Sequence, residues 1–264
     1  MPTLEAQGLI LALGLPASCR VDQRVPKKLL LENGAPTTAD KRLITEIIEE
    51  IQWVAALKPN TIGVPDYCDE LREYLEVAVL VVTLRSQSGH EKAKPANAAR
   101  LAELVHRAVP YPVLLLLRSE QCLALSLAHK RWAQNEAGKV VLDGDLVAAS
   151  LPEDAPSLDA LNAFVQVIAL TRQPRSSLFT LYQGWMDALQ ALLAAKMTGA
   201  FKTADSPQQA AARRHALQEC TRLEAEAARL RAQATKEKQL ARQVELNLAL
   251  KRVLVELAAA REQL

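Results

Sequence analysis

The last 57 residues of the chain, 208–264, contain neither glycine nor proline and consist almost entirely of helix-forming residues. Small or apolar side chains recur there every seven residues, at Cys220, Ala227, Ala234, Ala241, Leu248 and Val255. This heptad spacing predicts a long C-terminal helix with coiled-coil character, extending about 80 Å at 1.5 Å per residue. A helix of that length must pair its apolar stripe with another helix or fold back on itself.

The apolar stripe changes register near Leu240, which is typical of a stutter in a coiled coil. Its first half offers mostly alanine, which permits close helix approach, and its second half is rich in leucine. Burying a leucine contributes about 1.5–3 kcal/mol, so we expect the second half to drive self-association, with Asn247 setting the register. The expected oligomer interface comprises Leu223, Leu230, Val244, Leu248, Leu250, Leu254 and Leu257. The alternative is an antiparallel hairpin with the helices expected at about 158–196.

The middle of the chain is predicted to form a layer of strands. Residues 76–85 form a continuous, β-branched apolar run, which is typical of a strand buried on both faces. A polar loop over 86–95 and a helix at about 96–108 lead to a second apolar strand at 113–118. Shorter strands are expected at 122–128 and 139–142, with a turn at 135–138. One crossing helix followed by hairpins predicts an α+β fold with a mostly antiparallel sheet and packed helices.

Flanking segments complete the expected organisation. Residues 3–15 predict a short helix, and Thr37 or Thr38 is expected to cap a helix that runs to about Lys58. Within this second helix the apolar side chains follow helical spacing, at Ile44, Ile47, Ile48, Ile51, Val54 and Ala55. Prolines and acids after residue 151 mark a boundary, followed by helices at about 158–170 and 178–196. We therefore expect an α+β core over 1–152, a helical segment over 153–204 and the long helix over 205–264.

Composition and motifs exclude several classes of function. Thirty-two basic and thirty acidic residues leave a net charge of +2, which excludes a histone-like protein. The glycines are dispersed with no phosphate-binding loop, and neither G-x-S-x-G nor H-E-x-x-H occurs. Four scattered cysteines (Cys19, Cys68, Cys122, Cys220) and four histidines lack the clustering of a zinc site. We expect no cofactor, no metal, no catalytic residue, no membrane span and a cytoplasmic protein with free thiols.

Basic residues gather at two places that could contact phosphate. One group follows the first helix and the other ends a predicted strand, and together they comprise Arg24, Lys27, Lys28, Lys130, Arg131 and Trp132. Phosphate contact by the cations and stacking of Trp132 on a base would give weak DNA binding without sequence preference. A third pair, His106-Arg107, closes the helix at 96–108. The alternative is that these residues form a solvated sheet edge and charged helix ends.

A divergent metal-dependent nuclease is the competing enzymatic hypothesis. Its carboxylates would come from the region before the buried strand, at Asp66, Asp69, Glu70 and Glu76. The strand itself carries Thr83-Leu84-Arg85 where such sites place an acid and a lysine two residues apart, and threonine does not supply a charged ligand. The sequence therefore favours a protein without this catalytic site.

Several short segments together resemble a bacterial family known as domain of unknown function 4391. They are the runs 24–28, 50–54 with 57–59, 108–112, 236–240 and 243–247, and the resemblance spans residues 20–260. It implies a small α+β protein with a helical tail, often encoded beside DNA methyltransferases and helicases of restriction or phage-defence systems. It assigns no catalytic residue, and the helices at about 157–200 depart from its common pattern. We therefore expect a non-catalytic accessory subunit whose partner is a second copy, a helicase or a methyltransferase.

Overall fold

The computed structural model describes residues 5–85, 95–120, 123–134, 136 and 138–264. The chain divides into two compact units, residues 1–189 and residues 190–264. The division falls within helix α7 (Leu178–Thr198). We refer to the first as the sheet unit and to the second as the hairpin unit, and the domain boundaries expected at 152 and 204 stay predictions.

The sheet unit is built on a six-stranded sheet with the order β1-β2-β5-β6-β7-β8. Its strands are β1 (Arg20–Arg24), β2 (Ile48–Leu57), β5 (Val77–Leu84), β6 (Val113–Arg118), β7 (Leu123–Trp132) and β8 (Val140–Leu151). Neighbouring strands are antiparallel except β5 and β6, which are parallel and joined through α5 (Pro95–Ala108). A mixed α+β fold with a mainly antiparallel sheet is therefore confirmed.

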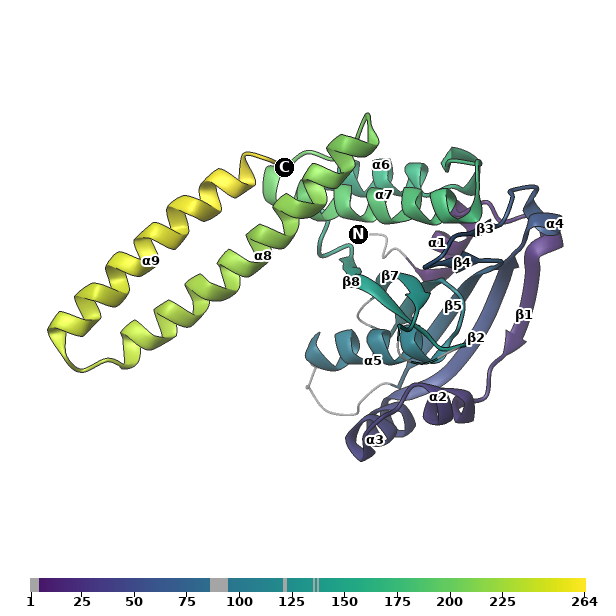
Figure 1. Ribbon diagram of the computed structural model, residues 1–264, viewed down its shortest axis with the longest axis horizontal. Helices are drawn as coiled ribbons and strands as arrows, with labels where there is room; N and C mark the ends of the chain where they lie inside the picture. Colours follow the sequence, from purple (N-terminus) through teal and green to yellow (C-terminus); the bar gives the residue numbers. More distant parts are fainter. Residues whose placement is uncertain (1–4, 86–94, 121–122, 135, 137) are drawn as a thin grey trace. The chain divides into compact units, whose positions relative to one another are not determined.

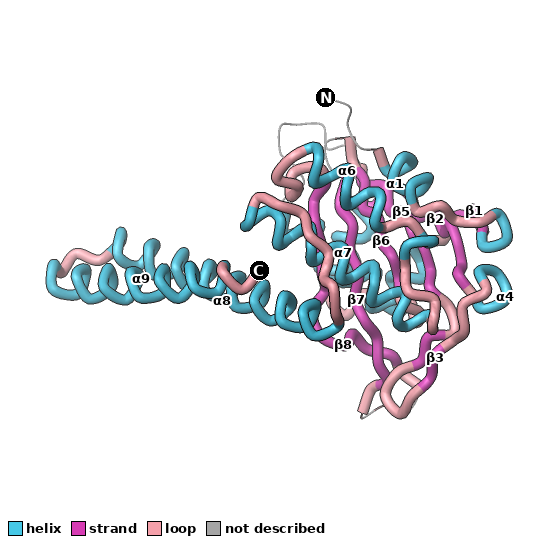
Figure 2. The backbone as a smooth tube through the Cα atoms, turned by 90° about the horizontal axis from the view of Figure 1, so that it is seen from above, coloured by secondary structure: helices cyan, strands magenta, loops and turns pink. Residues whose placement is uncertain are grey.

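Helices cover both faces of this sheet (Figures 1 and 2). On one face lie α2 (Lys27–Asn33), α3 (Thr38–Ile47) and α5, whose apolar side chains share a core with β2, β5 and β6. On the other lie α1 (Ala6–Ala12), α6 (Leu158–Val167) and the part of α7 up to Leu189. Because successive side chains of a strand point to opposite faces, two strands covered on both faces need apolar residues at successive positions, and β5 up to Val82 and β6 up to Leu117 have them.

Short elements connect these layers. They are the 3-10 turns η1 (Ala17–Cys19) and η2 (Leu170–Arg172), the short helix α4 (Pro59–Ile62), and a two-stranded ribbon of β3 (Tyr67–Cys68) and β4 (Glu73–Tyr74). β4 also lies against β7, which brings the ribbon to the end of the main sheet.

The prediction of a helix from Thr37 to about Lys58 was wrong beyond Ile47. Thr37 caps α3 as expected, its side chain accepting from the backbone N–H of Asp40. From Ile48 the chain is strand β2, which pairs on both sides, with β1 and with β5. Isoleucines at 44, 47, 48 and 51 fit a helical period, but β-branched residues also favour strands, and pairing with two strands satisfies every backbone group of a buried segment.

The other strand predictions were confirmed with different lengths. β5 and β6 lie where the apolar runs place them, and β7 and β8 extend further toward their C-terminal ends than expected. The loop over 86–94, Cys122 and two positions of the turn at 135–138 lie outside the described residues. Among the described cysteines, Cys19, Cys68 and Cys220 are free thiols. None of the helices in the described part of the chain is long and apolar enough to cross a membrane.

The C-terminal segment is helical but is interrupted once. α8 (Pro207–Lys236) is a long helix of 30 residues, and α9 (Leu240–Arg261) follows after a three-residue turn. The expectation of one uninterrupted helix was therefore wrong. Glu237 leaves the helical conformation, and its Oε1 accepts from the backbone N–H groups of Lys238 (2.8 Å) and Gln239 (3.0 Å). A carboxylate thus satisfies backbone donors at the turn without glycine or proline.

The two helices form an antiparallel hairpin, and both views show them side by side (Figures 1 and 2). An Arg261–Glu224 ion pair (2.8 Å) joins the end of α9 to the middle of α8. The seam between the helices buries the residues Cys220, Leu223, Ala227, Leu230, Val253 and Leu257. The heptad positions of α8 are therefore covered by the chain's own next helix, and a coiled coil between chains stays a prediction.

Candidate nucleic-acid interface

The first basic group lies where β1 passes into α2. Arg24 is paired with Glu50 (3.6 Å) and Lys28 with Glu32 (3.5 Å), and the side chains of both cations are more than 70% exposed. Lys27 donates to the backbone carbonyl of Ile48. Partial burial lowers the pKa of Lys27, and the nearby guanidinium groups of Arg85 and Arg24 lower it further. The structure thus adds Arg85, at the end of β5, to the predicted group.

The second basic group is less available to phosphate than the sequence suggests. Lys130 is only 3% exposed, and its Nζ donates to the carbonyls of His106 and Val109 at the end of α5. Burial lowers the pKa of this ammonium to about 7. Arg131 pairs with Asp143 (3.6 Å) and donates to the carbonyl of Trp132 (3.2 Å). The cations of this group therefore bind groups of the protein itself.

The directions of the strands place the two basic groups at opposite ends of the sheet. The Ile48 carbonyl bound by Lys27 lies beside Leu84, at the C-terminal end of β5. β7 runs antiparallel to β6, so Lys130 lies past the N-terminal end of β6. The predicted residues therefore lie at opposite ends of the sheet, and they do not form one continuous basic face. DNA binding by either group stays a prediction.

The third predicted pair also makes its contacts within the protein. His106 is fully buried, and its Nε2 bonds to the Ser126 hydroxyl (3.1 Å). Burial lowers its pKa to about 3, and the neighbouring Lys130 ammonium acts in the same direction. Arg107 pairs with Glu103 (2.6 Å) on the same helix.

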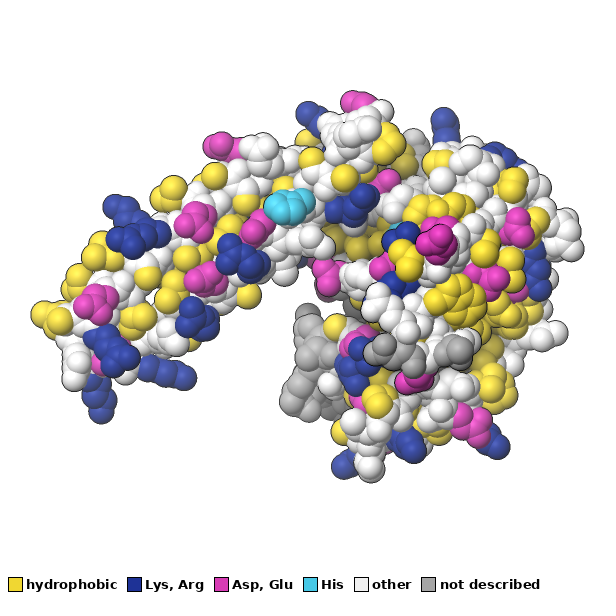
Figure 3. Space-filling view, in the orientation of Figure 1, with side chains coloured by type: hydrophobic (Ala, Val, Ile, Leu, Met, Phe, Trp, Pro, Cys, Tyr) yellow, Lys and Arg dark blue, Asp and Glu magenta, His cyan; other side chains and the backbone are white. Residues whose placement is uncertain are grey.

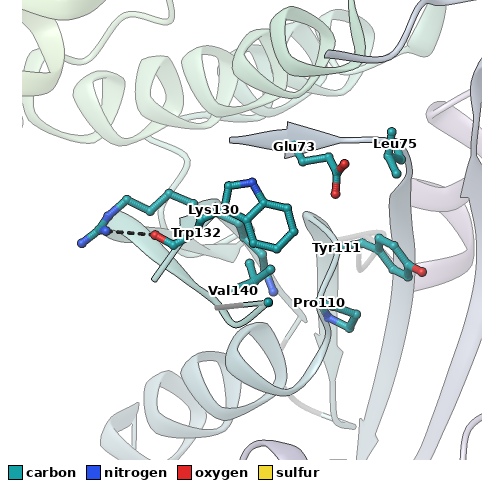
Figure 4. A pocket seen from close by; sticks show the side chains of 9 residues that line it. Glu73, Leu75, Pro110, Tyr111, Lys130, Trp132 and Val140 are labelled. Atoms are coloured by element: carbon teal, nitrogen blue, oxygen red, sulfur yellow. Dashed lines mark hydrogen bonds between the residues drawn. The ribbon is translucent and has the colours of Figure 1, made fainter. Parts of the chain in front are cut away.

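A cavity of about 130 Å³ opens beside Trp132. It is lined by side chains from the β3–β4 ribbon, the turn after α5 and strands β7 and β8, namely Glu73, Leu75, Pro110, Tyr111, Lys130, Arg131, Trp132, Gly138 and Val140. In Figure 4 the rings of Trp132 and Tyr111 lie on two sides of the opening, and the carboxylate of Glu73 points into the space between them. The sequence had identified Trp132 as a stacking residue, and the structure supplies its surroundings.

The opposite side of β4 and β7 carries a hydrogen-bonded chain that sequence reasoning missed. The Tyr74 hydroxyl bonds to Nδ1 of His129, and Nε2 of His129 lies 2.8 Å from the Gln183 Oε1. Gln183 in turn donates to Asp187 (2.8 Å). Because an amide oxygen only accepts, Nε2 carries the proton and Nδ1 of the neutral ring accepts from tyrosine. His129 is more than 50 positions from both Tyr74 and Gln183 in sequence, so no motif could have indicated this chain.

The carboxylates of the nuclease hypothesis are spread over separate structural roles. Asp69 accepts from the Tyr67 hydroxyl (2.7 Å) and from the backbone of Leu71 (2.8 Å), which stabilises the ribbon turn. Glu76 is buried and pairs with Lys58 (3.0 Å). Among the described residues, no group of three His, Cys, Asp or Glu side chains is placed to hold a metal ion.

Comparison with known proteins identifies one family. A family model described as "Domain of unknown function (DUF4391)" matches residues 13–257. This is the family to which the sequence motifs pointed, and the match covers nearly the whole chain. No curated protein and no solved structure matches the chain.

Proposed function

The chain belongs to the DUF4391 family, and we propose that it is a non-catalytic accessory subunit of a bacterial DNA-targeting assembly of the restriction or phage-defence type. In this proposal the subunit self-associates through its C-terminal hairpin. The DNA context is what the sequence resemblance implies, since it is a resemblance to proteins often encoded beside DNA methyltransferases and helicases. The observation that carries the proposal is an apolar stripe that the hairpin leaves exposed.

This stripe, the α9 stripe, consists of Leu240, Val244, Leu248 and Val255, which are 76%, 50%, 54% and 65% exposed. At about 100° per residue the four side chains fall within roughly 80° of the helix circumference. Three of the interface residues predicted from sequence, Leu223, Leu230 and Leu257, are buried in the seam instead, and Leu250 packs against it. Val244, Leu248 and Leu254 remain exposed.

A second copy of the hairpin fits this stripe. In a two-fold antiparallel contact centred between Ala249 and Leu250, Val244 of each copy lies opposite Val255 of the other. Lys251 also falls on the stripe, where its aliphatic stem can cover apolar surface while its ammonium reaches water. The hairpin surface otherwise mixes acidic, basic and apolar side chains, as the face shown in Figure 3 illustrates. Eight apolar side chains, four from each copy, would offset the entropic cost of association.

Light scattering on the full chain tests self-association. We expect a dimer that becomes a monomer in the Val244→Ser/Leu248→Ser variant, while the matched variant Leu11→Ser, which changes a 69% exposed leucine of the sheet unit, stays dimeric. A parent protein that is monomeric at every accessible concentration would contradict self-association and would leave a helicase or methyltransferase as the partner of the stripe.

Weak DNA binding is expected at the first basic group, because Arg24, Lys27, Lys28 and Arg85 present several cations around one place. Reversing the charge of Lys27 and Lys28 to glutamate should weaken filter binding at low salt and flatten its dependence on salt concentration. Reversing Lys236 and Lys238, at the hairpin turn, is the control of equal charge change. An equal loss of DNA binding in both variants would show that only the net charge of the protein matters, and it would exclude the first basic group as an interface.

The nuclease hypothesis remains the alternative, and it makes an opposite prediction. We expect no cleavage of plasmid DNA by the purified protein with Mg²⁺ or Mn²⁺. Metal-dependent cleavage that is lost in Asp66→Ala would overturn the non-catalytic function.

A further inference from the structure

The cavity beside Trp132 has the size of a single ring system. Pockets for drug-sized ligands are typically about 300–1,000 Å³, whereas this cavity holds about 130 Å³. It therefore admits one planar group of a larger molecule, with the remainder outside. Tyr111 (38% exposed) and Leu75 (46% exposed) at its mouth make it accessible from solvent.

Its walls favour a flat, aromatic group. Trp132 and Tyr111 present aromatic surface on two sides, with Pro110 and Val140 beneath them (Figure 4). Rings of this type stack on nucleobases, at about 1–3 kcal/mol per base. A methylated ammonium is the competing ligand for such a cavity, because it also contacts aromatic rings, and the experiment below includes it as an outcome.

The polar group at the opening decides which base is favoured. An ionised carboxylate only accepts hydrogen bonds, and Glu73 directs its carboxylate into the space between the rings. The Watson–Crick edge of guanine offers two adjacent donors, N1–H and the N2 amino group, that match two carboxylate oxygens. Adenine and cytosine each offer one amino donor beside an acceptor nitrogen, and thymine places its single N–H between two carbonyls.

Lys130 has a supporting role in this arrangement. Its Nζ donates to the carbonyls of His106, in the last turn of α5, and of Val109, the residue before the Pro110-Tyr111 wall. Trp132 follows it by two residues on β7, and the backbone N–H of Trp132 donates to Leu71 of the ribbon turn (2.8 Å). Hydrogen bonds thus fix both aromatic walls and the ribbon that carries Glu73.

From this geometry we propose that the cavity binds a guanine base, stacked between Trp132 and Tyr111, with the Glu73 carboxylate accepting from N1–H and the N2 amino group. The base can belong to a free guanine nucleotide or to a guanine in single-stranded nucleic acid, since the cavity contacts only the ring system. The site is independent of the α9 stripe and of the first basic group.

Calorimetric titration of the full chain tests this site with guanosine, inosine and adenosine 5′-monophosphates. Inosine monophosphate lacks the N2 amino group, so it should bind about ten-fold more weakly than guanosine monophosphate, and adenosine monophosphate more weakly still. Glu73→Gln and Trp132→Ala should each weaken guanosine monophosphate binding about ten-fold or more. Trp132→Phe should recover part of that loss, and Glu70→Gln, an exposed acid of the same ribbon, should bind as the parent does.

A second arm distinguishes the two sources of the base. The probes are an oligothymidylate with one central guanine and the same strand with adenine at that position. If the site takes single-stranded DNA, the guanine strand should bind more tightly than the adenine strand. If guanosine monophosphate binds and neither strand does, the site takes a free nucleotide. The proposal is overturned if neither ligand binds, if adenine and guanine bind equally, or if a trimethyllysine peptide binds in their place. The monomeric Val244→Ser/Leu248→Ser variant should bind guanosine monophosphate as the parent does, which separates this result from the test of self-association.

Discussion

The sheet unit and the hairpin unit bury their apolar side chains in different ways. In the sheet unit, strands β5 and β6 are covered on both faces, and residues such as Val79, Leu114 and Leu115 have at most 1% of their surface exposed. In the hairpin unit, two helices share a seam in which Cys220 and Ala227 alternate with leucines, and the outer stripe of α9 stays exposed. The first arrangement covers its central strands within one chain, whereas the second leaves a stripe of apolar side chains exposed.

Tyr182 illustrates how a buried polar group of the sheet unit is hydrogen-bonded. Its hydroxyl accepts from the backbone N–H of Ala128 (2.9 Å), within β7, and donates to the carbonyl of Val113 (2.7 Å), the first residue of β6. Burial of the ring raises the pKa of this phenol well above its usual value. A helix side chain therefore joins two strands, a kind of contact that a two-helix seam does not provide.

The largest effect is expected from the centre of the sheet. Leu115→Ala, at a fully buried position of β6, should lower the free energy of unfolding of the sheet unit by about 4 kcal/mol, because its neighbours are fixed by pairing on both sides. Urea unfolding followed by far-ultraviolet circular dichroism measures it. A loss below about 1 kcal/mol would show that the sheet core is loosely packed and would remove the contrast with the hairpin.

A leucine-to-alanine change in the hairpin seam should cause a smaller loss of unfolding free energy. Leu223→Ala should cost about 2 kcal/mol, since two helices can move together to close part of the cavity. Hydrogen exchange should show the loss in α8 and α9 and not in β5. Equal loss of protection in both units would mean that they unfold as one, contrary to the comparison.

Acid should weaken the sheet unit over a defined pH range. The pKa of His106 is lowered to about 3 in the folded protein, so between pH 6.5 and 3 the unfolded chain binds one proton more. Stability should therefore fall by about 1.4 kcal/mol for each pH unit across this range, and His106→Leu should remove that slope. An unchanged slope in the variant would show that another group is responsible.

The hairpin responds to acid through Glu237 instead. Hydrogen bonds from the backbone of Gln239 and Lys238 lower the pKa of this carboxyl. Its contribution is present above the ordinary glutamate pKa and is lost as the pH falls through the lower, folded value. Exchange protection around the α8–α9 turn should therefore persist to lower pH than that of the sheet unit.

Matched helix caps give the smallest expected effect and the sharpest test of independence. Thr37 caps α3 in the sheet unit, and Ser206 caps α8 in the hairpin unit, each accepting from a backbone N–H three residues on. Either change to alanine should cost about 1 kcal/mol. In thermal unfolding, Thr37→Ala should affect only the sheet unit and Ser206→Ala only the hairpin. A cap variant that destabilises the other unit equally would contradict the division.

Sequence reasoning succeeded where a local pattern determines the structure. The run at 76–85, which is apolar between its charged ends except at Thr83, predicts a strand covered on both faces, and α8 follows directly from its composition. It failed at Ile48–Leu57, because isoleucine spacing there fits a helix as well as a strand and only pairing with β1 and β5 decides. The turn at Glu237 carries no glycine or proline and depends on one side chain.

The candidate site was accessible from sequence only in part. Trp132 stood out because an aromatic residue beside two cations is typical of a stacking position. In the sequence, nothing distinguishes Lys130 from an exposed cation. Its burial follows from its position on β7, where its ammonium bonds to carbonyls at the end of α5. Glu73 and Tyr111 come from distant segments that the ribbon and the α5–β6 turn bring together, so their role required the fold.

Hydrogen exchange of the full chain at increasing protein concentration tests the central claim, that the sheet unit is complete and the α9 stripe needs a second copy. Amide protection in α9 around Val244, Leu248 and Val255 should rise with concentration, while protection of β5 and β6 stays constant. The Val244→Ser/Leu248→Ser variant should show no rise. Protection of α9 that is independent of concentration in the parent protein would contradict the claim.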